Sequence, residues 1–114
     1  MILTTSDALE SAISICKDGV NLSEISRTIS RIASQKGYNI SPDFNGHGIG
    51  ETFHQLPYIQ HNIDYIEEED ENVMKEGMTF TIEPILMQGE IFTNIMEDGW
   101  TAKTEDGGIF LLSL

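Results

Sequence analysis

Apolar residues in the first third of the chain recur every three to four positions, which is the spacing of an amphipathic helix. Between Ser6 and Lys17 this pattern predicts a first helix, with Ser6 as its N-cap. The residues of its apolar face are Leu9, Ala12, Ile13 and Cys16. The sequence KDGVN then interrupts the pattern, so we expect the helix to end there.

A second apolar stripe begins directly after this interruption. The sequence NLSE has the form of a capping box, in which Asn21 caps the helix and Glu24 reaches back to it. The stripe comprises Leu22, Ile25, Ile29, Ile32 and Ala33. Gly37 follows Lys36 and is a suitable residue for the position just after a helix end. The first third of the chain therefore predicts two helices with a short connection.

Beyond residue 37 the helical spacing stops, and prolines, glycines and aromatic residues become frequent. The sequence MTFTIEPIL, residues 78–86, alternates between apolar and polar positions and predicts a strand with Thr79, Thr81 and Glu83 on one face. EIFTNIMEDG and GWTAKTEDG predict a pair of strands around the turn Asp98-Gly99. The apolar end GIFLLSL can supply a last strand. Two helices followed by a mostly antiparallel sheet indicate an α+β fold in one domain, residues 1–114.

The charge balance narrows the classes of partner. The sequence contains six Lys and Arg residues and 19 Asp and Glu residues, which gives a formal net charge of −13. Binding to nucleic acid or to an anionic membrane needs clustered basic residues, so we expect neither partner. No apolar run is long enough for a membrane span, and no signal-peptide pattern is visible at the start. The acidic run at residues 67–72 lacks the central glycine of a calcium loop and predicts a solvated loop.

The single cysteine excludes an internal disulfide and a cysteine-rich zinc site. Cys16 lies at helical spacing among apolar residues and has no cluster of basic neighbours. Because reactive thiols need such neighbours, we expect Cys16 to pack in the interior and not to react.

The sequence FNGHGIGETFHQLP, residues 44–57, holds three glycines at alternate positions and two histidines. The glycine spacing does not fit a phosphate-binding loop. It is more typical of close backbone approach or of positive φ in a sheet. His47 and His54 can be structural residues satisfied by hydrogen bonds, or they can belong to a metal or acid–base site. His61, seven residues after His54, is expected to make loop or surface hydrogen bonds, with the rim of a cleft as the alternative.

Glu83 adds weight to the metal hypothesis. A carboxylate between Ile82 and Pro84 in an apolar strand is costly unless it is paired or binds a cation. Two histidines and one strand glutamate are a plausible part of a hydrolytic metal site. The residues alone leave the structural and the metal-binding interpretation open.

Four motifs taken together resemble a known family. GHGIG, FHxxP, GMTFTIEPIL and DGWTAKTEDG follow one another as in the C-terminal half of type I methionine aminopeptidases, which are pita-bread metallopeptidases. The resemblance covers roughly residues 8–107. It implies a partial pita-bread (creatinase/aminopeptidase-like) fold and an enzyme that removes the N-terminal methionine of nascent proteins. A noncatalytic pita-bread module that binds a peptide or protein is the alternative.

The resemblance also implies roles for individual residues. His47 matches the metal-binding histidine of GHGIG, and Glu83 matches the metal-binding glutamate of TIEP. His54 matches a catalytic histidine that contacts the substrate amide and the developing oxyanion. Phe53 and Trp100 match residues that line the pocket for the methionine side chain. The family binds two divalent ions per site, and the sequence does not distinguish Co, Mn, Fe and Zn.

Three of the five ligand positions of the family have no counterpart in this sequence. We therefore expect an incomplete catalytic domain that binds metal weakly and has little activity alone. We also expect self-association through an uncovered face of the sheet. The implied partner is a peptide or nascent chain that begins with methionine. The sequence SPDFNGHGIG resembles the organellar branch of the family, which favours a mitochondrion or another organelle, with the cytoplasm as the alternative.

Overall fold

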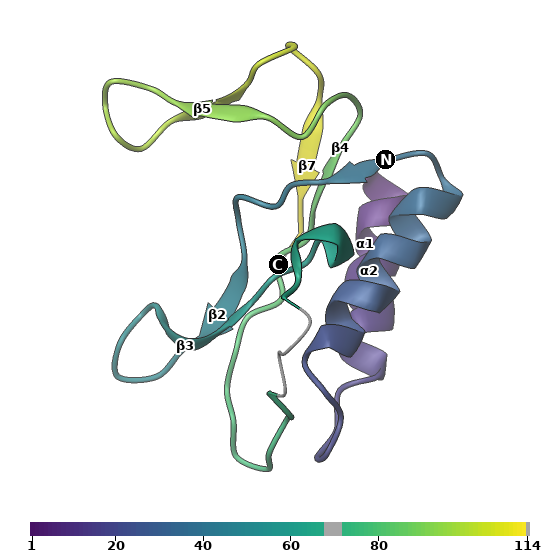
Figure 1. The fold of residues 1–114 in the computed structure, drawn as a ribbon, viewed down its shortest axis with the longest axis vertical. Helices are drawn as coiled ribbons and strands as arrows, with labels where there is room; N and C mark the ends of the chain where they lie inside the picture. The colour runs from purple at the N-terminus through teal and green to yellow at the C-terminus, as the bar shows by residue number, and fades with distance from the viewer. Residues whose placement is uncertain (68–71, 114) are drawn as a thin grey trace.

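The computed structural model describes residues 1–67 and 72–113. Two helices lie side by side along one flank of the molecule, and three small antiparallel sheets lie on the other (Figure 1). The helices are α1 (Ile2–Ser14) and α2 (Ser23–Gln35). The predicted α+β class, with helices first and antiparallel strands after them, is confirmed.

Helix α1 begins four residues before the predicted start, so the assignment of Ser6 as N-cap is wrong. Met1 is the N-cap residue, and its carbonyl accepts hydrogen bonds from the Thr5 N–H and hydroxyl groups. Thr4 and Thr5 are buried, whereas Ile2 and Leu3 are exposed. This first turn is therefore inverted in polarity, and the apolar spacing could not reveal it. Of the predicted apolar face, Leu9 and Ala12 are buried and Cys16 is partly buried, whereas Ile13 is 54% exposed, so its placement in the buried face is wrong.

Helix α2 buries most of its predicted apolar stripe, but the assignment of Asn21 as its N-cap is wrong. Leu22 is the N-cap residue, and the Asn21 side chain accepts a hydrogen bond from the Ser23 N–H at 2.9 Å. Glu24 lies 3.3 Å from Arg27 in an exposed ion pair. Gly37 adopts a φ of +74°, a left-handed conformation that ends the helix as predicted.

The main core lies between the helices and the sheets. Its buried residues from the helices are Ala8, Leu9, Ala12, Leu22, Ile25, Ile29 and Ala33. Ile40, Ile59, Ile82 and Leu86 contribute from the other side. Ile32, which the sequence placed in the apolar stripe, packs against this core while partly buried.

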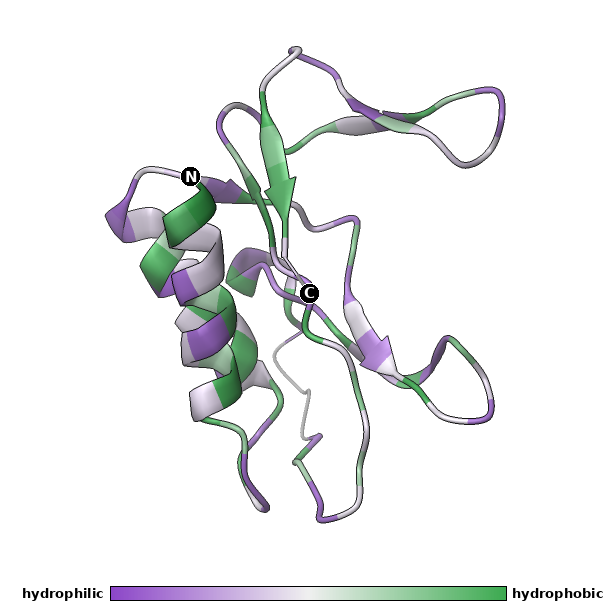
Figure 2. Cartoon of the chain, turned by 180° about the vertical axis from the view of Figure 1, so that it is seen from behind, coloured by the Kyte–Doolittle hydropathy of each residue, from purple (hydrophilic) through white to green (hydrophobic). Residues whose placement is uncertain are grey.

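The central sheet has the strand order β1–β4–β7, with β1 (Asn39–Ile40), β4 (Ile85–Met87) and β7 (Phe110–Leu112). Leu86 faces the helices, whereas Ile85 and Met87 face the opposite side. Strand β7 is hydrophobic throughout (Figure 2) and pairs with β4 as the predicted last strand. The sheet therefore has apolar side chains on both faces.

A second sheet consists of β2 (Gly46–Gly48) and β3 (Gln55–Ile59), and the short 3-10 helix η1 (Ile63–Tyr65) follows it. The strand predicted over residues 78–86 is correct only in part. Residues 78–84 carry no strand assignment beyond an isolated bridge between Phe80 and Gly48, and β4 begins at Ile85. Pro84, which lacks an N–H group, lies at the break.

The third sheet is the hairpin of β5 (Thr93–Ile95) and β6 (Ala102–Thr104), which projects from the rest of the molecule (Figure 1). Its turn contains Asp98 and Gly99, and Gly99 has a φ of +71°, as the predicted turn requires. Residues 68–71 of the acidic run, which the sequence predicted as a solvated loop, lie outside the described residues. Neither helix of the described residues has the length and apolar character to cross a bilayer.

Candidate metal centre and adjoining cavities

The glycines of GHGIG allow backbone segments to approach closely. A Cβ atom on Gly46 would overlap the Thr81 carbonyl, and one on Gly48 would overlap the Leu56 carbonyl. Neither glycine has a positive φ. Of the two structural roles suggested by the spacing, close approach is confirmed and positive φ is wrong.

This close approach fixes His47 against Thr81. The Thr81 N–H donates to the His47 carbonyl at 2.8 Å, and the His47 N–H donates to Thr81 Oγ1 at 3.1 Å. Thr81 Oγ1 in turn donates to Glu83 Oε1 at 2.7 Å. The fold therefore places His47 and Glu83 on neighbouring segments, and Thr81 bonds to both residues.

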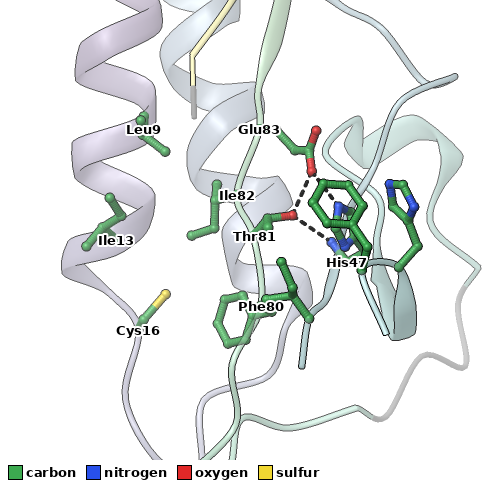
Figure 3. A pocket seen from close by; sticks show the side chains of 11 residues that line it. Leu9, Ile13, Cys16, His47, Phe80, Thr81, Ile82 and Glu83 are labelled. Carbon is green, nitrogen blue, oxygen red and sulfur yellow. Dashed lines mark hydrogen bonds and ion pairs between the residues drawn. The ribbon is translucent and has the colours of Figure 1, made fainter. Parts of the chain in front are cut away.

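The His47 ring has a partner at each nitrogen, and Figure 3 shows the contact with Glu83. Nδ1 lies 3.0 Å from the Gly48 carbonyl oxygen, and Nε2 lies 3.0 Å from Glu83 Oε1. A carbonyl oxygen only accepts hydrogen bonds, so Nδ1 carries a hydrogen. Nε2 of the neutral ring then presents a lone pair to a carboxylate oxygen. This contact is attractive only when a proton or a cation lies between the two atoms.

His47 and Glu83 fit part of a divalent-metal site. Imidazole nitrogen and carboxylate oxygen are ligands for Zn, Mn, Fe and Co. The bond from Nδ1 to a backbone carbonyl is the outer contact that orients metal-binding histidines. Among residues 1–67 and 72–113, no group of three or more His, Cys, Asp or Glu side chains could hold a metal ion. Within this part of the chain, the pair offers two candidate ligands.

A cavity of about 620 Å³ opens beside this pair (Figure 3). Its polar lining consists of His47, His54, Thr81 and Glu83. Its apolar lining consists of Leu9, Ile13, Cys16, Ile49, Phe53, Phe80 and Ile82. The arrangement joins a charged corner to a mostly apolar chamber, which suits a ligand with one polar end and one apolar end.

The structure brings His54 and Phe53 to the same corner. The ring centroids of His47 and His54 lie 4.3 Å apart, and Phe53 meets His54 edge to face at 4.6 Å. His54 is exposed, and Phe53 keeps 69% of its surface exposed. Both side chains can therefore contact a ligand that enters the cavity.

Trp100 lies elsewhere, with 90% of its surface exposed. It borders a second cavity of about 430 Å³, together with the outward side chains of β4 and β7. Glu83 lines both cavities. The structure thus places Phe53 and Trp100 in two cavities that share Glu83, and it does not bring the two aromatic residues together in one.

His61 is the residue that the sequence pattern misjudged. It lies in the loop between β3 and η1, as expected, but a surface position is wrong, because the side chain has 0% exposure. Its Nε2 atom accepts a hydrogen bond from the Glu83 N–H at 3.0 Å. Burial lowers the pKa of His61 to about 4, which keeps the ring neutral near pH 7. Ile59, two residues earlier, is buried, and this alternation is the signal that could have placed His61 inside.

Cys16 is partly buried at the end of the larger cavity, as the expectation of packing requires. Its Sγ donates to the Ala12 carbonyl at 3.2 Å, and burial raises the pKa of the thiol. The cysteine is therefore a weak nucleophile that contributes apolar surface to the cavity.

Comparisons with known proteins agree with this geometry. The model of metallopeptidase family M24 matches residues 2–111. The chloroplastic methionine aminopeptidase 1B of Arabidopsis thaliana is 40% identical over 109 residues, which is 96% of this chain and 28% of that protein. The methionine aminopeptidase of Escherichia coli (strain K12) is 40% identical over 102 residues, which is 90% of this chain and 38% of that protein.

The fold comparison gives the same result. The crystal structure of methionine aminopeptidase from Rickettsia prowazekii superposes with a TM-score of 0.88 at 33% identity. It covers 97% of this chain, which corresponds to 44% of that protein. The described residues therefore have the partial pita-bread architecture expected from the motifs, and the chain spans less than half the length of these relatives.

Proposed function

The chain belongs to metallopeptidase family M24, and from this premise we propose that it carries the His and Glu part of a methionine aminopeptidase active site. The observation that carries the proposal is the pair of His47 Nε2 and Glu83 Oε1, 3.0 Å apart at the mouth of an apolar cavity. The reaction is the removal of an N-terminal methionine, and the partner is a peptide or nascent chain that begins with it.

His47 and Glu83 are the residues that would hold a divalent cation. When bound, such a cation supplies Lewis-acid polarisation of a peptide carbonyl. Gly48 keeps the His47 ring oriented through Nδ1, and Thr81 supports Glu83 through its hydroxyl. The donor atoms are common to Co, Mn, Fe and Zn sites, so the identity of the ion stays open.

His54 is proposed as the catalytic hydrogen-bond donor. Its ring lies beside His47, and its exposure leaves it available to a substrate carbonyl on which negative charge develops. Such a donor contributes roughly 2.7–4 kcal/mol when it is aimed at an oxyanion. Phe53 packs edge to face against His54 and limits the orientations of the ring.

The apolar chamber is proposed to bind the methionine side chain. Its lining combines aromatic and aliphatic groups, which suit an unbranched and polarizable thioether. Phe53 borders this chamber directly. Trp100 is proposed to contact the substrate from the second cavity, across the shared Glu83.

A chimera tests the enzyme hypothesis. Residues 1–114 would replace the matching segment of the Rickettsia prowazekii protein, and release of methionine from Met-Gly-Met would be measured with added Co(II) or Mn(II). We expect metal-dependent release that falls by about 100-fold or more in His47→Ala and Glu83→Gln, and by about 10²–10³ in His54→Ala. A folded chimera that releases no methionine would overturn the proposal.

The alternative is a noncatalytic module that binds a peptide. The observation that favours it is the limited ligand set, because the described residues contain no group of three or more His, Cys, Asp or Glu side chains that could hold a metal ion. A module of this kind would bind Met-Gly-Met in the chimera, and in the isolated chain, without metal and without cleavage. We expect the isolated chain to bind metal weakly and to show little or no turnover.

Location and self-association stay predictions. The relatives include a protein named chloroplastic and a bacterial protein, and a mitochondrion or another organelle is proposed on the sequence context of GHGIG.

Self-association is proposed through exposed apolar groups of the central sheet, Phe110 and Leu112, and sedimentation over a range of concentrations would test it.

A further inference from the structure

We propose that His61 is a positioning residue, whose buried ring accepts the Glu83 N–H and thereby holds the Glu83 carboxylate beside His47. The inference rests on the proposed role of Glu83 as a metal ligand. Its test uses neither metal nor substrate, so failure of the inference and failure of the proposed function can be told apart.

The backbone around Glu83 needs an acceptor of this kind. The preceding residues bond to the β2 side, because the Ile49 N–H donates to the Thr79 carbonyl and the Thr81 N–H donates to the His47 carbonyl. In a regular antiparallel ladder the Glu83 N–H would continue this series on the same side. Pro84 lies at the point where the ladder stops, and the Glu83 N–H bonds instead to His61 Nε2 at 3.0 Å.

The surroundings of the ring fix its place. His61 has no exposed surface. A Cβ atom on Gly46 would lie 3.0 Å from Cε1 and 3.2 Å from Nε2 of His61, so the glycine leaves just enough room for the ring. Any displacement of the ring would also move the residue that precedes Pro84. The position of Glu83 is therefore coupled to the packing of His61 under the GHGIG strand.

The histidine carries a cost that an apolar residue would avoid. Because Nε2 accepts a hydrogen bond, the hydrogen of the neutral ring lies on Nδ1. Nδ1 is buried and has no hydrogen-bond partner among the described residues. A buried donor without a partner is unfavourable. The bond from Glu83 to Nε2 is the contribution that a leucine of similar size could not make.

The tautomer of His61 is the first measurement. Long-range ¹H–¹⁵N correlation on the wild-type chain at pH 7 should show a hydrogen on Nδ1 and a free lone pair on Nε2. The opposite tautomer would overturn the proposal, because Nε2–H could not accept from Glu83. This measurement needs no variant and does not depend on whether a substituted chain folds.

Two variants then separate positioning from general stability. His61→Gln keeps an acceptor near the position of Nε2, whereas His61→Leu removes it. We expect the Glu83 amide to exchange with solvent at least tenfold faster in His61→Leu, relative to the Thr81 and Ser41 amides. His61→Gln should restore most of the protection. Nuclear Overhauser contacts between the His47 ring and the Glu83 side chain should weaken in His61→Leu and persist in His61→Gln.

Ile29→Val is the matched control, because it thins the core in α2 away from Glu83. It should speed exchange at all three amides by a common factor. If His61→Leu also speeds the three amides equally, or if the His47–Glu83 contacts persist in it, His61 is only a core residue and the proposal fails. If His61→Leu does not fold, the tautomer and the His61→Gln contacts decide the question.

Discussion

The Nε2 atom of His47 lies 3.0 Å from the Oε1 atom of Glu83, although 35 residues separate them in the chain. Thr81 connects the two, since it bonds to the His47 backbone and to the Glu83 carboxylate. The pair is thus positioned by the Thr81 hydroxyl, and the Thr81 N–H also donates to the His47 carbonyl. Such preorganisation is what a metal site requires before the ion arrives.

This relationship predicts how the isolated chain responds to metal. Calorimetric titration with Co(II) or Mn(II) should show binding weaker than micromolar, because two ligands leave most of the coordination sphere to water. His47→Ala should abolish it. Glu83→Gln should lower the metal affinity by more than about tenfold. Removal of a residue that only orients a ligand already costs about tenfold, and Glu83 is proposed as a ligand itself.

His54→Gln is the control for this titration. It removes a nearby imidazole that is not assigned as a ligand, so metal affinity should stay within about twofold of the wild type, inside the usual context dependence of such values. Equal losses in His54→Gln and His47→Ala would contradict the assignment of His47 as the ligand. Complete absence of binding in the folded wild type would show that the pair alone is insufficient.

The glycines of GHGIG give a steric prediction. Gly48→Ala would force a Cβ atom into the Leu56 carbonyl, a backbone group that cannot rotate away. We expect a loss of about 1–3 kcal/mol in the free energy of unfolding, as for other overpacked sites. Urea denaturation, followed by circular dichroism, measures this loss.

Gly50→Ala is the matched control in the same motif. Its Cβ would lie 3.2 Å from Nε2 of the Gln55 side chain, which can move aside, and its φ is not positive. The change in unfolding free energy should stay within about 0.5 kcal/mol. Equal effects of the two substitutions would show that close approach of the backbone is not what Gly48 provides.

The elements that the sequence predicted well are those in which local pattern and burial agree. The stripe of α2 and the turn at Gly99 follow rules that need only neighbouring residues. The start of α1 failed because its first turn buries threonines and exposes Ile2 and Leu3. The strand predicted over residues 78–86 was too long. Residues 79 and 81 make only a few irregular hydrogen bonds to the β2 region, and Pro84 has no N–H group with which to continue a ladder.

In the candidate site, too, some features were predicted from the sequence and others depend on the tertiary structure. The cost of a carboxylate between Ile82 and Pro84 pointed to Glu83, and the structure gives it the expected polar partners. The alternation after Ile59 was the only sequence signal for the burial of His61, and the space for its ring depends on Gly46 on another strand, which the sequence does not show. The separation of Phe53 from Trp100 is likewise a property of the tertiary arrangement, since the projecting β5–β6 hairpin carries Trp100.

Two aspartates should make the β5–β6 hairpin and the segments at its base sensitive to acid. Asp98 accepts from the Trp100 and Thr101 N–H groups and from the Thr101 hydroxyl, and Asp106 accepts from the Glu90 and Gly108 N–H groups. These hydrogen bonds lower the pKa of both carboxyls from the usual 3.8. A lowered carboxyl pKa stabilises the fold above 3.8, and this contribution is lost as pH falls through the folded value.

The measurement compares amide exchange in the hairpin and in α2 as the pH is lowered below 3.8. The Thr101 and Gly108 amides should lose protection before the Ile29 amide. Asp98→Asn at neutral pH should reproduce the loss at Thr101, whereas Glu97→Gln, which removes the adjacent charge, should not. Simultaneous loss of protection in the hairpin and in α2 would contradict a local role for the aspartates.

Cys16 provides a chemical probe of the larger cavity. Its thiol is partly buried, donates to Ala12 and has a raised pKa, so little thiolate is present at neutral pH. We expect iodoacetamide to alkylate the folded chain at least tenfold more slowly than the chain unfolded in urea, as mass spectrometry can follow.

Because Cys16 lines the cavity beside Ile13 and Phe80, a methionine peptide that fills the chamber should slow alkylation further. Alkylation of the folded chain at the unfolded rate would contradict this packing of Cys16. Protection by a glycine peptide equal to that by a methionine peptide would show that the chamber does not select the thioether side chain.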